Sequence, residues 1–362
     1  MKKILLHSLI IIVLLTAVFI LPLYYPKGPA IYFRLFLLIV ILIETMKLFK
    51  IVFIDRRINK IISNAGTVLF SIFVIFILLE AIFMFIPRSH SADFTLASKL
   101  WYAKYWKPIN SLGFRDYEPT GDHHVILFVG DSFTAGHGLK SIEDRFSNII
   151  GREANQKGKK YTAINIGKPN LDTRGEYDVM KQFFYETRIK PEKIILQYGG
   201  NDIEGASADF GIKFDGFKPP ANMNKFLILV GSGSYFLNYI YWQFPREYLG
   251  MPYMTFLSQA YKNDRILSKH KEDLQLFMDY AKENSIQLIV VVFPFLADVE
   301  MSDSMYVNDI VDFFKANKVS VINVSQLVKD IPVSERIINK NDGHPSKRVN
   351  RLVAQEILNK LE

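Results

Sequence analysis

Three long apolar runs open the chain, at residues 4–23, 30–47 and 66–87. The second run carries Arg34 near its start and Glu44 near its end, and the only formal charge of the third is Glu80. A helix needs about 20 apolar residues, at ~1.5 Å each, to cross a bilayer. The first and third runs meet this length, whereas the second is marginal and fits either a short span or an interfacial helix. Glu80 lies deep in its run, so we expect it to pair with another span.

From residue 125 onward the pattern changes to short apolar segments that alternate with amphipathic ones. The strand-like segments are residues 125–129, 161–166, 193–198, 286–293 and 319–324. The helix-like segments between and after them are about 141–156, 174–187, 265–284, 303–316 and 346–361. Continuous apolar strands separated by helices are typical of a parallel sheet covered on both faces. The pattern therefore predicts an α/β domain with a five-stranded parallel sheet over residues 121–362.

Two segments fall outside this rhythm. Residues 88–120 form a predicted connector between the membrane region, residues 1–87, and the α/β domain. Its aromatic cluster fits either a place near the membrane interface or a cap on the domain: Trp101, Tyr102, Tyr105 and Trp106. Residues 203–260 form a predicted insertion, rich in aromatic residues, of a size that can shape the rim of a site.

The placement of basic residues predicts how the chain crosses the membrane. Five lie from the last residue of the second run up to the start of the third: Lys47, Lys50, Arg56, Arg57 and Lys60. Only Lys27 lies between the first and second. Short loops rich in Lys and Arg stay on the cytoplasmic side, and two spans would translocate the entire basic loop. We therefore expect three spans in a cell-membrane protein, with a cytoplasmic N-terminus and an extracytoplasmic C-terminal domain.

A cleaved signal peptide is the alternative interpretation of the first run. No small-x-small cleavage site follows it, because the next residues read ILPLYY, and two further apolar runs come after. The basic loop also accounts for part of the net charge of +8 without nucleic-acid binding. The chain has no cysteine, which excludes disulfides, thiolate nucleophiles and cysteine metal sites.

A serine follows the first predicted strand, in Phe128-Val129-Gly130-Asp131-Ser132. In open α/β sheets ligands bind beyond the carboxyl ends of the strands, so the Ser132 hydroxyl is placed to react. It needs a base, because a serine hydroxyl is a weak nucleophile at neutral pH. Of the seven histidines, five lie in the membrane run, the connector, the wrong end of a strand or a charged helix. His137 and His344 remain as candidate bases.

Two further short motifs lie at predicted loop positions. Asp342-Gly343-His344-Pro345 places a carboxylate two residues before an imidazole, where it can fix the tautomer and stabilise the imidazolium. Gly199-Gly200-Asn201-Asp202 ends the third strand, and its Asn201 supplies an amide donor for a developing oxyanion. Each motif alone is more typical of an ordinary turn.

Together and in this order, the three motifs resemble the GDSL/SGNH family of serine esterases. The resemblance covers residues from about 110 to the C-terminus, and the run Asn110-Ser111-Leu112-Gly113-Phe114-Arg115 is similar to one found in membrane-tethered members. The resemblance implies a flavodoxin-like three-layer α/β/α fold, with Ser132 as nucleophile, His344 as base and Asp342 orienting His344. It implies neither a metal nor an organic cofactor.

The oxyanion donors implied by the resemblance are the Ser132 backbone N–H, the Asn201 side chain and a backbone N–H after the second strand. In the run Asn165-Ile166-Gly167-Lys168-Pro169-Asn170 this last donor falls on Asn170, with Gly167 as the alternative. The chain departs from the family in two places. The acid often stands three residues before the histidine, where this chain has Asn341, and the second block has Asn170 in place of a glycine.

The sequence thus favours a membrane-anchored extracytoplasmic serine ester hydrolase. The expected substrate is an acyl ester, such as an O-acetyl group on a cell-envelope glycan. One alternative is an O-acyltransferase for an envelope polysaccharide, which would need a separate acyl-donor membrane protein. Another is a non-catalytic envelope protein on the same fold. A cytoplasmic lipid esterase would require the basic loop to face outward.

Overall fold

The computed structural model describes residues 2–24, 29–54, 60–92, 95–121, 124–156, 160–218, 231–243, 247–248 and 250–361. The chain divides into two compact units. One comprises Met1–Lys104 with Pro219–Arg246, and the other comprises Tyr105–Lys218 with Glu247–Glu362. The predicted connector is thus divided between the units, and the middle of the predicted insertion belongs to the same unit as the apolar helices.

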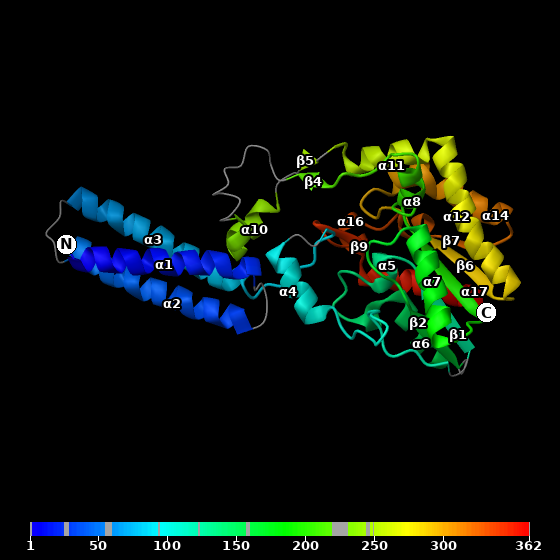
Figure 1. Ribbon diagram of the computed structural model, residues 1–362, viewed down its shortest axis with the longest axis horizontal. Helices are drawn as coiled ribbons and strands as arrows, with labels where there is room; N and C mark the ends of the chain where they lie inside the picture. The colour runs from blue at the N-terminus through cyan, green and yellow to red at the C-terminus, as the bar shows by residue number, and fades with distance from the viewer. Residues whose placement is uncertain are drawn as a thin grey trace. The chain divides into compact units, whose positions relative to one another are not determined.

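The second unit is built on five parallel strands (Figure 1). These are β1 (His124–Val129), β2 (Tyr161–Asn165), β3 (Lys193–Tyr198), β6 (Gln287–Val292) and β7 (Ser320–Asn323). Their order in the sheet is β2-β1-β3-β6-β7, and every neighbouring pair is parallel. This is the 2-1-3-4-5 order of flavodoxin-like folds. The prediction of a five-stranded parallel α/β sheet is confirmed, with strand ends within two residues of those expected.

Both faces of the sheet are covered by helices, as the alternation along β1 requires. Val125, Leu127 and Val129 point into one apolar core, and Ile126 and Phe128 point into the other, because successive strand side chains lie on opposite faces. The first core is closed by α7 (Thr173–Thr187), α12 (Asp264–Glu283) and α14 (Asn308–Ala316). The second is closed by α6 (Phe146–Gln156) and α17 (Lys347–Leu361).

Shorter elements complete this unit at the ends of the strands. The helices are α5 (Ser132–Ala135), η2 (Ile142–Asp144), α8 (Glu204–Asp209), α11 (Tyr253–Tyr261), α13 (Val299–Ser302), η3 (Asp303–Val307), α15 (Val324–Val328) and α16 (Val333–Arg336). The remaining strands are β4 (Phe217–Lys218), β5 (Glu247–Tyr248), β8 (Ile337–Asn339) and β9 (Asp342–Pro345). The helix predicted at 303–316 is divided between a π-helical turn and α14.

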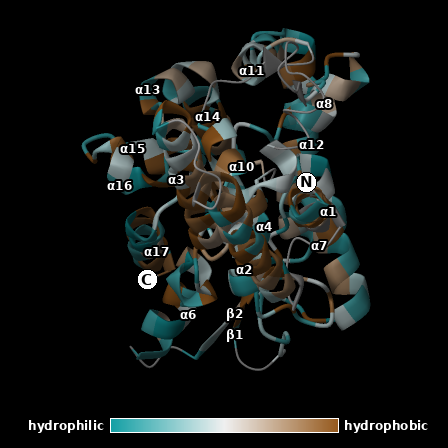
Figure 2. Ribbon diagram, turned by 90° about the vertical axis from the view of Figure 1, so that its left-hand side faces the viewer, coloured by the Kyte–Doolittle hydropathy of each residue, from teal (hydrophilic) through white to brown (hydrophobic). Residues whose placement is uncertain are grey.

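The first unit contains α1 (Lys2–Tyr24), α2 (Pro29–Phe49), η1 (Lys50–Ile54), α3 (Lys60–Phe83), most of α4 (Leu96–Tyr105) and α10 (Tyr235–Tyr241). Figure 2 shows predominantly hydrophobic colouring along the long helices. Within the described residues, Lys2–Ile20 and Lys60–Phe83 are long and apolar enough to cross a membrane. The prediction of three spans is therefore not confirmed. The third candidate, α2, has 21 residues but carries Arg34, Glu44 and Lys47, which lower its apolar character.

Glu80 does pair with another helix, as its depth in the run predicts. Arg34 of α2 forms a buried ion pair with it, and the same carboxylate accepts a hydrogen bond from Ser234 Oγ at 2.6 Å. The backbone N–H groups of Tyr235 and Phe236 donate to it at 2.9 and 3.1 Å. Residues 234–236 of the predicted insertion are therefore hydrogen-bonded to the Glu80 carboxylate of α3.

Candidate active site

The nucleophile candidate stands where β1 turns into α5. Gly130 has φ of +156°, and a Cβ at this position would lie 2.3 Å from Thr134 Oγ1, so only glycine fits the turn. Asp131 caps α5 by accepting a hydrogen bond from the Phe133 N–H at 2.8 Å. Ser132 is consequently the first residue of the helix, where the backbone N–H has no intrahelical acceptor.

A hydrogen-bonded chain links Ser132, His344 and Asp342. The Ser132 Oγ lies 2.8 Å from His344 Nε2, and His344 Nδ1 lies 2.5 Å from Asp342 Oδ1. The imidazole and the carboxylate come from β9, which pairs with β8 beside the nucleophile, and both are buried. Of the two candidate bases, His344 is therefore the one that contacts the serine. The carboxylate two residues before it, rather than the position of Asn341, contacts its Nδ1.

The loop after β2 supplies a backbone donor near the nucleophile helix. Asn170 adopts the left-handed conformation with φ of +63°, which asparagine tolerates better than most residues. Within the described part of the chain, the N–H groups of Ser132 and Asn170 have no hydrogen-bond acceptor. The N–H of Gly167 instead donates to Asn165 Oδ1 at 2.9 Å. Asn170 thus fits the predicted donor role better than Gly167.

The Asn201 side chain is the third predicted donor. Its amide donates one hydrogen to the Leu171 carbonyl at 3.0 Å, which fixes the orientation of the side chain. The neighbouring Asp131 carboxyl is buried, and the Asn201 amide favours its charged form. Burial raises the pKa of Asp131, and the Phe133 N–H opposes this rise.

Two more buried carboxyls lie behind this loop. Burial, followed by repulsion from Asp202, raises the pKa of Glu176 well above its usual value. Burial and the neighbouring Asp131 likewise raise the pKa of Asp202 well above its usual value, although the Gly199 N–H donates to Asp202 at 2.7 Å. The loop that carries Asn201 therefore rests on carboxyl groups that tend to keep their protons.

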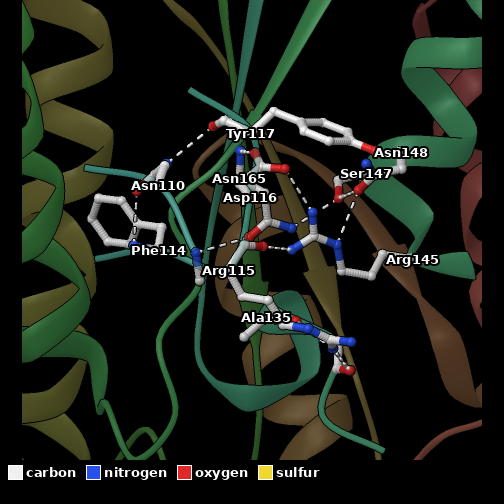
Figure 3. Close-up of polar contacts among 12 residues, drawn as sticks. Asn110, Phe114, Arg115, Asp116, Tyr117, Ala135, Arg145, Ser147, Asn148 and Asn165 are labelled. Carbon is white, nitrogen blue, oxygen red and sulfur yellow. Dashed lines mark hydrogen bonds and ion pairs between the residues drawn. The ribbon is translucent and has the colours of Figure 1, made fainter. Parts of the chain in front are cut away.

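A buried polar network holds the nucleophile helix in place (Figure 3). Arg145 donates to Asp116 Oδ1 at 2.8 Å, and the Asn165 N–H donates to Asp116 Oδ2 at 2.8 Å. The Asn165 amide reaches the Thr134 carbonyl in α5, also at 2.8 Å. Burial raises the pKa of Asp116, and the charge of Arg145 opposes this effect. The sequence run 110–115 pointed to this region, but nothing in the local pattern identified the pairing of Asp116 with Arg145.

His137, the other candidate base, lies against the triad, and its backbone N–H donates to the Ser132 carbonyl at 2.9 Å. It forms, with Asp342 and His344, a buried group whose potential metal-binding atoms lie within 4.8 Å of one another. However, both ring nitrogens of His344 hydrogen-bond protein groups. The two imidazole planes are stacked at 24°, so their in-plane lone pairs do not converge on one point. This donor set fits a catalytic triad better than a metal centre.

Among solved structures, the chain is similar to several esterases. The acetyl xylan esterase AlAXEase has 15% identity and a TM-score of 0.41, covering 66% of this chain and 100% of that one. The psychrotrophic esterase EstA from Pseudoalteromonas sp. has 12% identity and a TM-score of 0.40, with 66% and 96% covered. AlinE4, an SGNH-hydrolase family esterase, has 16% identity and a TM-score of 0.36, with 67% and 97% covered.

No family model and no curated protein matches the chain. The similar solved structures also include a lipolytic protein of the G-D-S-L family from Desulfitobacterium hafniense, and the three sequence motifs resemble the same family. Identities and scores this low assign no role to any residue of this chain.

Proposed function

We propose that this protein is a serine ester hydrolase of SGNH type. The observation that supports this most directly is the uninterrupted chain of hydrogen bonds from Ser132 Oγ through His344 to Asp342. In such an arrangement the imidazole acts as general base, and the buried carboxylate fixes its tautomer and stabilises the imidazolium. Three different residues thus act as nucleophile, base and orienting acid, and their side chains meet beyond the carboxyl end of β1.

The reaction proceeds in two half-reactions. His344 Nε2 takes the Ser132 hydroxyl proton while Oγ bonds to the ester carbonyl carbon, and the carbonyl oxygen becomes an oxyanion. Collapse of this intermediate breaks the bond to the alcohol oxygen, which leaves with the proton from His344. Water then repeats the sequence: it gives a proton to His344, attacks the acyl-enzyme, and releases the carboxylic acid and Ser132.

Backbone donors stabilise the oxyanion in both half-reactions. The backbone N–H groups of Ser132 and Asn170, which have no acceptor among the described residues, supply two donors, and the Asn201 side-chain amide supplies the third. Removing one such donor typically costs about 10²–10³ in rate. The left-handed backbone of Asn170 fulfils the role that a glycine has at the corresponding place in the family.

The enzyme is anchored in the cell membrane by three spans, α1, α2 and α3, with the catalytic unit outside. The charges of α2 do not prevent this, because Arg34 pairs with Glu80, and Glu44 contacts Lys47 and His7. A helix of 21 residues spans roughly 31 Å at 1.5 Å per residue, about the thickness of the hydrocarbon core. An outward-facing domain of this kind acts on envelope esters, such as O-acetyl groups on a glycan.

Hydrolysis of a chromogenic acetyl ester tests the reaction. The wild-type protein is expected to release the chromophore, and Ser132→Ala is expected to reduce kcat to the background rate. Ser141→Ala is the matched control, because Ser141 only caps a 3-10 turn. Equal rates for wild type and Ser132→Ala would exclude the proposed mechanism.

Single cysteines test the sidedness, because the chain has none of its own. An impermeant maleimide is expected to label Lys190→Cys in intact cells, and Lys60→Cys only after permeabilisation. Both positions are exposed in the structure. The reverse pattern would contradict an extracytoplasmic catalytic unit.

A further inference from the structure

His137 is a buried histidine five residues after the nucleophile in the sequence. It comes directly after α5 and the left-handed Gly136, and its backbone N–H donates to the Ser132 carbonyl at 2.9 Å. The side chain is only 1% exposed. The backbone of His137 is thus tied to the nucleophile, and the three-residue mechanism does not account for its buried imidazole.

The ring of His137 lies against two members of the triad, His344 and Asp342. It stacks on the His344 ring, with centroids 4.2 Å apart. Its Nε2 lies 3.7 Å from Asp342 Oδ2, the carboxylate oxygen that does not receive His344 Nδ1. Asp342 therefore has one imidazole at each of its two oxygens, and His344 has the second imidazole along its face.

The loop that carries His137 is itself held rigidly. Arg115 donates to the carbonyls of Gly136 and Leu139 at 2.5 and 2.7 Å, on either side of His137. The Arg115 guanidinium also lies 4.8 Å from the centroid of the Trp106 ring, which in turn packs against His137 at 6.1 Å. A Cβ on Gly138 would lie 2.8 Å from Asp342 Oδ2. Only glycine therefore lets the loop backbone come this close to the carboxylate.

We propose that His137 is a positioning residue for the catalytic triad, an inference that rests on the proposed esterase function. Its ring prevents His344 from turning out of line with Ser132. Its Nε2 faces the second oxygen of Asp342 and draws carboxylate charge away from the oxygen that holds His344. His137 therefore adjusts both the aim and the basicity of the catalytic base without touching the substrate.

Three substitutions separate the two effects. His137→Phe keeps a flat ring against His344 but removes the nitrogen that faces Asp342. His137→Asn keeps a polar donor but removes the stack, and His137→Ala removes both. His124→Phe is the matched control, because His124 is exposed at the opposite end of β1 and pairs with Glu192. The titratable groups that face His344 are Asp342 at its Nδ1, His137 along its ring and Asp131 through its charge. Arg115 faces His137 through the Trp106 ring.

The pH dependence of kcat/KM for acetyl-ester hydrolysis is the decisive readout. In His137→Phe the acid limb is expected to move to higher pH by roughly 0.5–1 unit, because the carboxylate directs more charge to His344. In His137→Ala the same shift is joined by a fall in kcat of roughly tenfold or more, with KM nearly unchanged, since misalignment slows the chemical step. A purely structural role would lower activity equally at every pH. An acid limb at the wild-type position in both variants would overturn the proposal.

A second readout is independent of turnover. The downfield proton resonance of the hydrogen bond between His344 and Asp342, assigned by its loss in Asp342→Ala, is expected to shift in His137→Phe and to stay in place in His124→Phe. If the wild type shows no hydrolysis that depends on Ser132, the proposed function fails while this measurement still tests His137. An unchanged resonance in His137→Phe would overturn the positioning role in either case.

Discussion

Asp342→Asn removes the negative charge that orients the catalytic base. Asp342 is fully buried, and its Oδ1 lies 2.5 Å from His344 Nδ1, so the asparagine side chain has no room to turn away. If its NH₂ faces Nδ1, the imidazole must carry its proton on Nε2, which is the atom that has to accept the Ser132 proton. The charge that stabilises the imidazolium is lost as well.

The expected loss in kcat for Asp342→Asn is about 10⁴, as for the removal of an orienting aspartate in other serine enzymes. This corresponds to roughly 5 kcal/mol of transition-state stabilisation, at 1.36 kcal/mol for each factor of ten. The assay is acetyl-ester hydrolysis, with KM expected to change little. Asn341→Ala is the control, and the double variant Asn341→Asp/Asp342→Asn tests whether an acid three residues before His344 can replace the natural one. A kcat for Asp342→Asn within tenfold of wild type would refute the proposed role of Asp342.

Three further predictions concern the oxyanion loop, the buried carboxyls and the apolar helices. Asn201→Ala is expected to lower kcat by about 10²–10³ at a similar KM; a change confined to KM would count against an oxyanion role. Because the pKa of Glu176 is raised in the folded state, its stabilising contribution is present at low pH and is lost as pH rises. The Tm of Glu176→Gln relative to wild type should therefore rise from pH 4 to pH 8, by roughly 2–4 °C for each kcal/mol of unfolding free energy that the wild type loses. A Tm difference that is the same at both pH values would contradict this. Glu80→Ala leaves Arg34 buried without its ion-pair partner, so the free energy of unfolding in detergent should fall by about 3–5 kcal/mol. The double variant Arg34→Met/Glu80→Leu should recover part of this loss. Equal stability of the single and double variants would exclude a buried pair.

The sequence was sufficient for the sheet because the determinants of its strands are local. Each strand is a short run of apolar residues bounded by polar or turn residues, and five such runs separated by helices permit few arrangements. The position of Ser132 beyond the end of the first strand followed from the same reasoning, since ligands bind outside the carboxyl ends of parallel strands. His344 lies on β9, a short strand outside the main sheet, and only the motif resemblance placed it beside the nucleophile.

Features that depend on distant side-chain pairing were not accessible from local patterns. Arg34 and Glu80 are 46 residues apart, and Ser234 is 154 residues beyond Glu80. The aromatic segment 231–243 therefore looked like the rim of a site, whereas it packs on the apolar helices. The choice between Gly167 and Asn170 likewise required backbone geometry, because it depends on which N–H is already bonded. The stack of His137 on His344 had no signal in the sequence beyond the presence of a second candidate base.

Covalent labelling with a fluorophosphonate tests the central claim most directly, because the probe reacts with a serine only when a base activates it. The purified full-length protein, its Ser132→Ala variant and its His344→Ala variant are incubated with the probe and digested, and the modified peptide is identified by mass spectrometry. We expect one label per chain, on Ser132, with none in Ser132→Ala and a greatly reduced rate in His344→Ala. An unmodified Ser132 in the wild type, or labelling that proceeds equally fast without His344, would contradict the account.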